Sequence, residues 1–136
     1  MGFERDPAHW LRRLSPEEWI SAALGELRRA EEAFAKNDPR AAIAGAKRAA
    51  GMALNGALLV EPNEAWGRSY VEHVAALSHD DRVPEQVRVQ CKFLVEVKMP
   101  GSDLLGLRSK AHDERVLEAA RDVMAHAYAV VVRHAS

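Results

Sequence analysis

Aromatic residues are scarce in this chain. They make up 6% of its 136 residues, although hydrophobic residues make up 48%. A packed interior is therefore expected, but one filled largely by alanine, which favours helices that approach each other closely. A chain of this length can bury a core without disulfides or metals. The sequence predicts one domain, residues 1–136, in which residues 1–14 form a short N-terminal helical extension.

Cysteine is almost absent too. Cys91 stands alone, which excludes an intrachain disulfide and a cysteine-ligated zinc site. The chain has no HExxH motif, and no glutamate stands three residues before a histidine, so the signatures of zinc proteases and di-iron bundles are missing. The sequence predicts no metal site and no cofactor, and Cys91 is expected to be a small core residue.

Neither a strong excess of one charge nor a long apolar run is present. The formal net charge is −1 and the pI is about 6.6, which argues against a dedicated nucleic-acid binder. No stretch approaches the roughly 18 apolar residues of a membrane span, and MGFERDPAHW has no apolar signal segment. We expect a cytoplasmic, soluble protein with no membrane partner.

Helix-start signals are plentiful. Ser15 and Pro16 open a helix in which Glu18 completes a capping box, and Asp38-Pro39 opens the next one. The first of these helices is expected to run to about residue 36. Its predicted inward face is Trp19, Ile20, Ala23, Leu24, Leu27, Ala30 and Phe34.

The second of these helices, RAAIAGAKRAAGMALNGALLV, is rich in alanine and contains Gly45, Gly51 and Gly56. Each glycine costs about 1 kcal/mol of helix propensity relative to alanine. Such costs are tolerable where neighbouring backbones come very close, so we predict a central helix packed on both sides. Its predicted stripe is Ile43, Ala46, Ala50, Ala53, Leu54, Ala57 and Leu58.

Further helices are expected over residues 64–79 and 114–135, the last capped by Asp113 and with Val116, Ala120, Val123, Met124, Ala127 and Val131 inward. Between them, VRVQCKFLVEV alternates apolar and polar residues like a strand, but it also carries two helical stripes. No partner strand is available, so we predict a helix that is apolar nearly all round and therefore central or at a subunit interface. The fold class is all-α, an antiparallel up-and-down bundle of four to five helices.

Several stretches resemble the HEPN family of small helical bundles. FAKNDPRAAIAGAKRAAGMALNGALL is similar to the family's first loop and second helix, and EAWGRSYVEHVAAL resembles its third. VPEQVRVQCKFLVEVKMP resembles the fourth helix and HDERVLEAARDVMAHAYAVV the last. The resemblance implies a ribonuclease toxin, the partner of a small nucleotidyltransferase, or a nucleotide-binding module. It also implies a homodimer.

Family ribonucleases use an Arg–His pair, in which the Arg stabilises the phosphorane and the His orients the attack of the 2′-hydroxyl. Two pairs here have that spacing, Arg68 with His73 and Arg121 with His126. About two such pairs are expected by chance, so the spacing alone carries no weight. The resemblance places the catalytic candidates at Arg68 and His73. Arg121 is expected at a helix surface and His126 partly buried.

Two basic clusters are candidates for binding phosphate. Arg108, Lys110 and Arg115 lie around the last loop, and Arg40, Lys47 and Arg48 lie on the alanine-rich helix. The first set is the better candidate, because loops between helices more often carry function. The alternative is that both sets are solvent-facing charges balanced by nearby acidic residues.

The prediction is a dimeric HEPN-like binding or interaction module rather than an enzyme. Its ligand would be a nucleotide or RNA, or a protein partner of the nucleotidyltransferase or antitoxin kind. One alternative is a metal-independent ribonuclease toxin. Another is a scaffold or regulatory adaptor that binds no ligand and uses an exposed helical face.

Overall fold

The computed structural model describes residues 13–61, 70–98 and 110–134, and the secondary structure among these residues is helical. The five helices are α2 (Pro16–Ala35), α3 (Pro39–Val60), α4 (Tyr70–Ser78), α5 (Glu85–Glu96) and α6 (Lys110–Arg133). The predicted all-α bundle is confirmed. The predicted helical extension at residues 1–14 lies almost wholly outside the described part of the chain.

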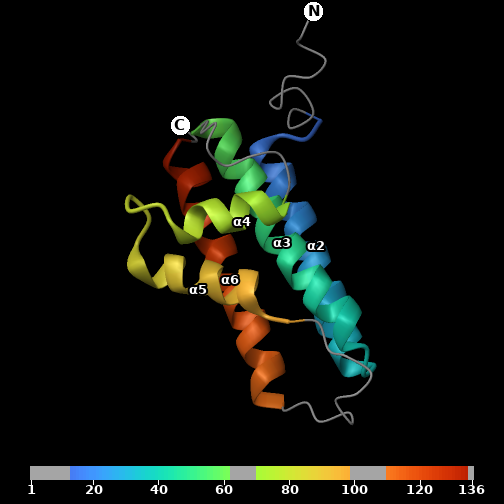
Figure 1. The fold of residues 1–136 in the computed structure, drawn as a ribbon. Helices are drawn as coiled ribbons and strands as arrows, with labels where there is room; N and C mark the ends of the chain where they lie inside the picture. The colour runs from blue at the N-terminus through green and yellow to red at the C-terminus, as the bar shows by residue number, and fades with distance from the viewer. Residues whose placement is uncertain (1–12, 62–69, 99–109, 135–136) are drawn as a thin grey trace, which may run out of the picture.

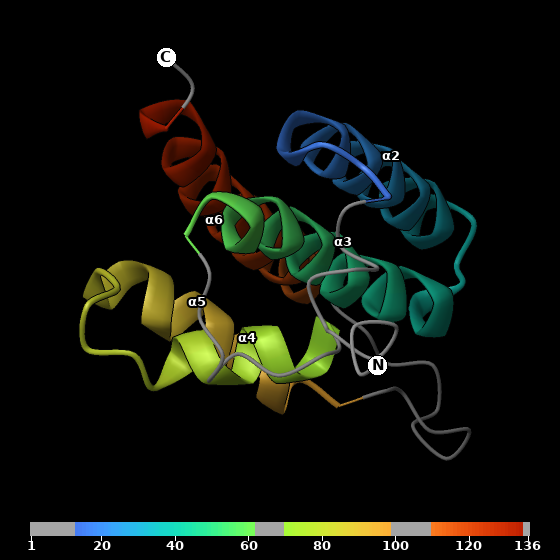
Figure 2. The ribbon, with the colours of Figure 1, turned by 90° about the horizontal axis from the view of Figure 1, so that it is seen from above.

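Three long helices, α2, α3 and α6, form the body of the molecule (Figure 1). Helix α2 runs antiparallel to both α3 and α6, and the shorter α4 crosses in front of α3. Seen from above, α2 lies on one side of α3 and the α4–α5 pair on the other (Figure 2). Helix α3 contacts α2, α4 and α6, and α6 also contacts α2 and α5.

The predicted starts of α2 and α3 are confirmed, whereas α6 already includes Lys110 and so begins ahead of the start predicted after Asp113. The Ser15 hydroxyl accepts a hydrogen bond from the Glu18 backbone N–H at 3.1 Å, and the Glu18 carboxylate accepts one from the Ser15 N–H at 2.8 Å. At the start of α3, the Asp38 carboxylate accepts a hydrogen bond from the Ala41 N–H at 3.2 Å. Both helices carry proline in the first turn, where no N–H is needed.

The turn between α2 and α3 is set by Asn37, which has a positive φ of 63°. Its N–H donates to the Phe34 carbonyl at 3.0 Å, and the Asp38 N–H donates to the Ala33 carbonyl at 2.8 Å. This is the Schellman pattern, in which a left-handed residue lets the chain satisfy the last helix carbonyls. Because Asp38 also caps α3, the two helices are joined with almost no intervening loop.

Helix α3 is the central helix, as predicted. Its buried positions are Ala42, Ile43, Gly45, Ala46, Ala49, Ala50, Gly51, Ala53, Leu54, Asn55, Gly56, Ala57 and Leu58. A Cβ atom at Gly45 would lie 3.3 Å from the Ala30 Cβ, and one at Gly56 would lie 2.8 Å from the Pro16 carbonyl oxygen. The close approach inferred from the glycines is confirmed at these two positions.

Most of the predicted inward faces are correct. The stripes of α3 and α6 are buried at every predicted position, and so is the stripe of α2 with one exception. Leu24 was expected in the core, but 43% of its side chain is exposed. Helical periodicity placed it at the edge of the apolar face, and no neighbouring helix covers that edge completely.

The segment that also resembled a strand is helical, but it is not central. The buried side of α5 consists of Val87, Gln90, Cys91 and Leu94. Val89 is 49% exposed and Val95 is 40% exposed, so the central placement of this helix is wrong, while its placement at a subunit interface stays a prediction. Helix α5 packs on α4 and α6 along one face, and its opposite face meets solvent. No helix within the described ranges has the length and apolar character to cross a membrane.

Two glycine-to-alanine changes test the close packing of α2 and α3. Gly56→Ala is expected to lower the free energy of unfolding by about 1–3 kcal/mol, because the new methyl meets a backbone carbonyl that cannot rotate away. Gly25→Ala is the matched control. The nearest atom to its new Cβ is the flexible end of Arg29 at 3.9 Å, so we expect about 0.5–1 kcal/mol of stabilisation. Urea denaturation measures both; equal effects would contradict the packing described here.

Candidate functional site

The predicted catalytic pair is only half described. Arg68 lies outside the described residues, and His73, on α4, has none of its side-chain surface exposed. A general base must reach the proton that it removes. In this structure the His73 imidazole is part of the protein interior.

The second Arg–His pair does not form a site. The Arg121 guanidinium binds the Glu31 carboxylate of α2, with Nη2 2.5 Å from Oε2. His126 is half-buried, and the charges of Arg133, Glu61 and Asp80 act on it. Residues five apart on a helix are separated by about 140°, and the two side chains diverge accordingly. Arg121 at the surface and His126 partly buried are as predicted.

Of the predicted phosphate ligands, Arg108 lies outside the described residues and Lys110 is exposed at the start of α6. The third, Arg115, points at α5. Its Nη1 donates to the Gln90 side-chain oxygen at 2.6 Å, and its guanidinium carbon lies 4.0 Å from the centre of the Phe93 ring. Arg115 therefore joins α6 to α5 through a hydrogen bond and a cation–π contact.

Gln90 is the centre of this link between α5 and α6. It is 2% exposed, and its amide nitrogen donates to the Asp122 carboxylate at 2.5 Å while its oxygen accepts from Arg115. Both ends of the buried amide are thus paired, which avoids the cost of an unsatisfied polar group. Sequence reasoning missed Gln90. The signal was its position between Val87 and Leu94 on the buried stripe.

The basic residues of α3 are also engaged with the protein. Arg48 Nε donates to the Glu26 carboxylate of α2 at 2.8 Å. Lys47 Nζ donates to the backbone carbonyl of Val97 at 3.1 Å, just beyond the end of α5. A cation there interacts favourably with the helix dipole. Partial burial lowers the pKa of Lys47 below its usual value.

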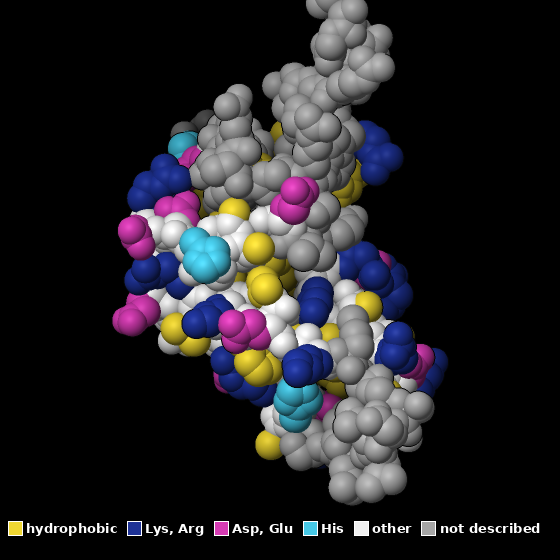
Figure 3. All heavy atoms as spheres, in the orientation of Figure 1, with side chains coloured by type: hydrophobic (Ala, Val, Ile, Leu, Met, Phe, Trp, Pro, Cys, Tyr) yellow, Lys and Arg dark blue, Asp and Glu magenta, His cyan; other side chains and the backbone are white. Residues whose placement is uncertain are grey.

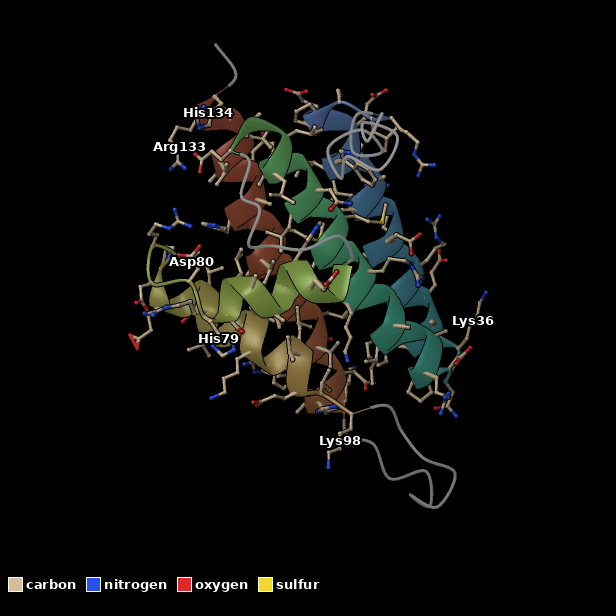
Figure 4. All side chains as sticks on the ribbon, turned by 45° about the horizontal axis from the view of Figure 1, so that its top comes forward. Lys36, His79, Asp80, Lys98, Arg133 and His134 are labelled. Carbon is tan, nitrogen blue, oxygen red and sulfur yellow. The ribbon has the colours of Figure 1, made fainter. Side chains whose placement is uncertain are left out.

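Charged side chains from three segments meet where α3 and α6 end. The Glu61 carboxylate accepts a hydrogen bond from Arg133 at 2.8 Å and is 2.6 Å from the His134 imidazole. Figure 4 shows Arg133 and His134 next to each other at the end of α6. The hydrogen bond from Arg133, together with His134, lowers the pKa of Glu61. Asp80 and Arg82 form a bidentate pair in the α4–α5 turn. Within the described residues, no three His, Cys, Asp or Glu side chains are placed to hold a metal ion.

Large exposed apolar side chains lie on α2, α5 and α6, and the two most exposed of them are on α6. Tyr128 is 56% exposed and Val132 is 50% exposed. Together with exposed Ala125 and Ala129 they follow the spacing i, i+3, i+4 and i+7, which is one face of a helix. We call these four residues the α6 stripe.

Leu24 of α2 extends this apolar surface. The Arg121–Glu31 ion pair joins α6 to α2, and the two helices are antiparallel. Tyr128 lies seven residues, about two turns, beyond Arg121, and Leu24 lies seven residues before Glu31. Tyr128 and Leu24 therefore lie at about the same height along the two helices. Each is on the side of its helix that carries the Arg121–Glu31 ion pair. By contrast, the face over α4 and α5 carries basic and acidic side chains next to each other, with hydrophobic atoms in small separate areas (Figure 3).

The half-buried His126 predicts an acid-sensitive stability. Burial, and then the charge of Arg133, lowers its pKa below the usual 6.5, so the folded state resists protonation more than the unfolded state does. The contribution of His126 to stability is therefore complete above about pH 6.5 and is lost as the pH falls through the lowered value. The free energy of unfolding of His126→Gln should depend less on pH between about pH 7.5 and 5 than that of the wild type. His79→Gln, at an exposed position, is the control; equal slopes in all three proteins would contradict the assignment.

The thiol of Cys91 is expected to be unreactive in the native protein. Burial raises the pKa of its thiol to about 12, and its side chain is fully buried. Because the thiolate is the reactive form, labelling of the native protein by an aromatic disulfide reagent should proceed only as fast as the protein opens. In guanidinium the same thiol should react at once. Rapid labelling without denaturant would show that α5 opens locally.

Comparison of the chain with models of known protein families, with curated proteins and with solved structures finds no match.

Proposed function

We propose that this chain is a non-catalytic, HEPN-like interaction module that acts as a homodimer. The observation that supports this function is the α6 stripe with its neighbour Leu24. Tyr128 and Val132 are each at least half exposed on a helix whose other face is fully packed. Contiguous apolar surface of this kind on a small protein marks a site of association.

The composition of the stripe suits a protein partner. Tyrosine contributes a large apolar ring and a hydroxyl at a low cost in side-chain entropy, and it is enriched among the residues that dominate binding energy. Ala125 and Ala129 leave room beside Tyr128 for the side chains of a facing helix. This is the pattern expected of a helix-to-helix contact.

The state of the reactive groups also favours association over catalysis. His73 is fully buried, and the pKa of Cys91 is raised to about 12. Arg121 is held in an ion pair by Glu31, and Arg115 is bound to Gln90. Arg121 and Arg115 thus have structural partners in the described part of the chain, and His73 and Cys91 are enclosed within it.

The proposal predicts that the purified protein is a dimer at roughly 10 to 100 μM, the range expected for a small interface. Tyr128→Lys should shift it to a monomer, because a charge replaces the central apolar side chain. Val89→Lys is the matched control, since Val89 is 49% exposed on a different helix. Sedimentation equilibrium measures all three proteins.

The same experiment includes nucleotides and short RNAs. For an interaction module, neither the sedimentation behaviour nor the thermal midpoint should change when they are added. A wild-type protein that is monomeric over the whole range would contradict the homodimer. A midpoint raised by a nucleotide would favour the nucleotide-binding alternative instead.

A further inference from the structure

We propose that two copies of this chain pair through α6 in antiparallel orientation, about a two-fold axis that passes between Ala125 and Tyr128. This inference rests on the proposed function and specifies its interface. The evidence for it is the order of side chains along the exposed face of α6. Two such faces match each other in size and charge only when one helix runs antiparallel to the other.

The solvent face of α6 has the spacing of a coiled-coil seam. Its exposed residues recur at alternating intervals of three and four, at Ala111, Glu114, Glu118, Arg121, Ala125, Tyr128 and Val132. A helix with this spacing presents one continuous line of side chains to a partner helix. The apolar part of the line covers its last third, where α6 approaches the end of the chain.

Antiparallel pairing matches large side chains with small ones. In an antiparallel coiled coil, a side chain at heptad position a faces a side chain at position d of the partner helix. Ala125 is at an a position and Tyr128 at a d position. Ala125 therefore faces the partner's Tyr128, and Tyr128 faces the partner's Ala125. Val132 then faces the partner's Arg121. Because the Arg121 guanidinium is turned to Glu31 within its own chain, its methylene groups are left to cover the valine.

The charges agree with the same arrangement. Glu118 is exposed near the start of the seam and Arg133 near its end, where it keeps 64% of its side chain exposed while it binds Glu61. Antiparallel pairing brings Glu118 close to the partner's Arg133, and it also opposes the two helix dipoles favourably. Parallel pairing would place Glu118 against Glu118, Arg121 against Arg121 and two tyrosines in one layer. A second copy in reversed orientation is therefore the occupant that fits.

Cross-linking through introduced cysteines tests the register. Cys91 does not interfere, because it is fully buried. In Ala125→Cys the two new thiols lie within about one helical turn of the axis, on helices roughly 8 to 10 Å apart. A short bis-maleimide should therefore join them in high yield. Ala111→Cys is the control on the same exposed line, and its thiols would be roughly 45 Å apart along the antiparallel pair.

Charge reversal gives a second, independent measurement. Glu118→Arg should weaken the dimer several-fold at low salt, because Arg133 of the other copy then meets a like charge. Glu114→Arg makes the same charge change one turn earlier, beyond the end of the partner helix, and should leave the dissociation constant unchanged. Sedimentation equilibrium measures both variants.

The outcomes separate this inference from the proposed function. A wild-type dimer in which Ala125→Cys cross-links and Ala111→Cys does not supports the antiparallel pairing. Equal cross-linking of both variants would mean parallel pairing and would overturn it. A dimer in which neither variant cross-links would overturn the α6 interface while leaving the homodimer intact. A monomeric wild type would overturn both, and the α6 stripe would then be a site for a different protein.

Discussion

The close contact between α2 and α3 is the constraint on which the rest of the structure depends. At Gly56 the backbone of α3 approaches the Pro16 carbonyl so closely that no side chain fits between them, and Gly45 makes a similar approach to Ala30. Small residues along α3 let it touch three other helices at close range. The large side chains of Trp19 and Phe34 are buried in the same core, whereas Tyr128 lies at the surface.

Polar contacts between helices determine which partners many of the chain's charged side chains bind. Gln90 holds Arg115 and Asp122, Lys47 binds the carbonyl of Val97, and Glu61 binds Arg133 and His134. Each contact joins segments that are far apart in the sequence. Three basic residues of the two clusters seen in the sequence, Lys47, Arg48 and Arg115, are therefore held by three separate structural contacts.

Local signals allowed the helices and the starts of α2 and α3 to be predicted, because caps, prolines and the Asn37 turn act over a few residues. Apolar periodicity likewise identified nearly all of the core. It could not tell that Leu24 is exposed or that α5 lies at the periphery, because that depends on how far neighbouring helices extend over each face. The surroundings of the candidate Arg and His residues could not be predicted from the sequence. The complete burial of His73 and the Arg121–Glu31 pair arise from contacts between distant segments, and no motif encodes them.

The turn at Asn37 and Asp38 also bears on how the chain folds. Because it joins α2 directly to α3, the most extensive helix contact in the molecule forms between segments that are neighbours in the sequence, at little cost in loop-closure entropy. Contacts of low sequence separation form fast, so we expect this hairpin to be the folding nucleus. On the ribosome it would be complete before α6 is synthesised. Until then, the alanine-rich face of α3 that α6 later covers would be the aggregation-prone surface of the nascent protein.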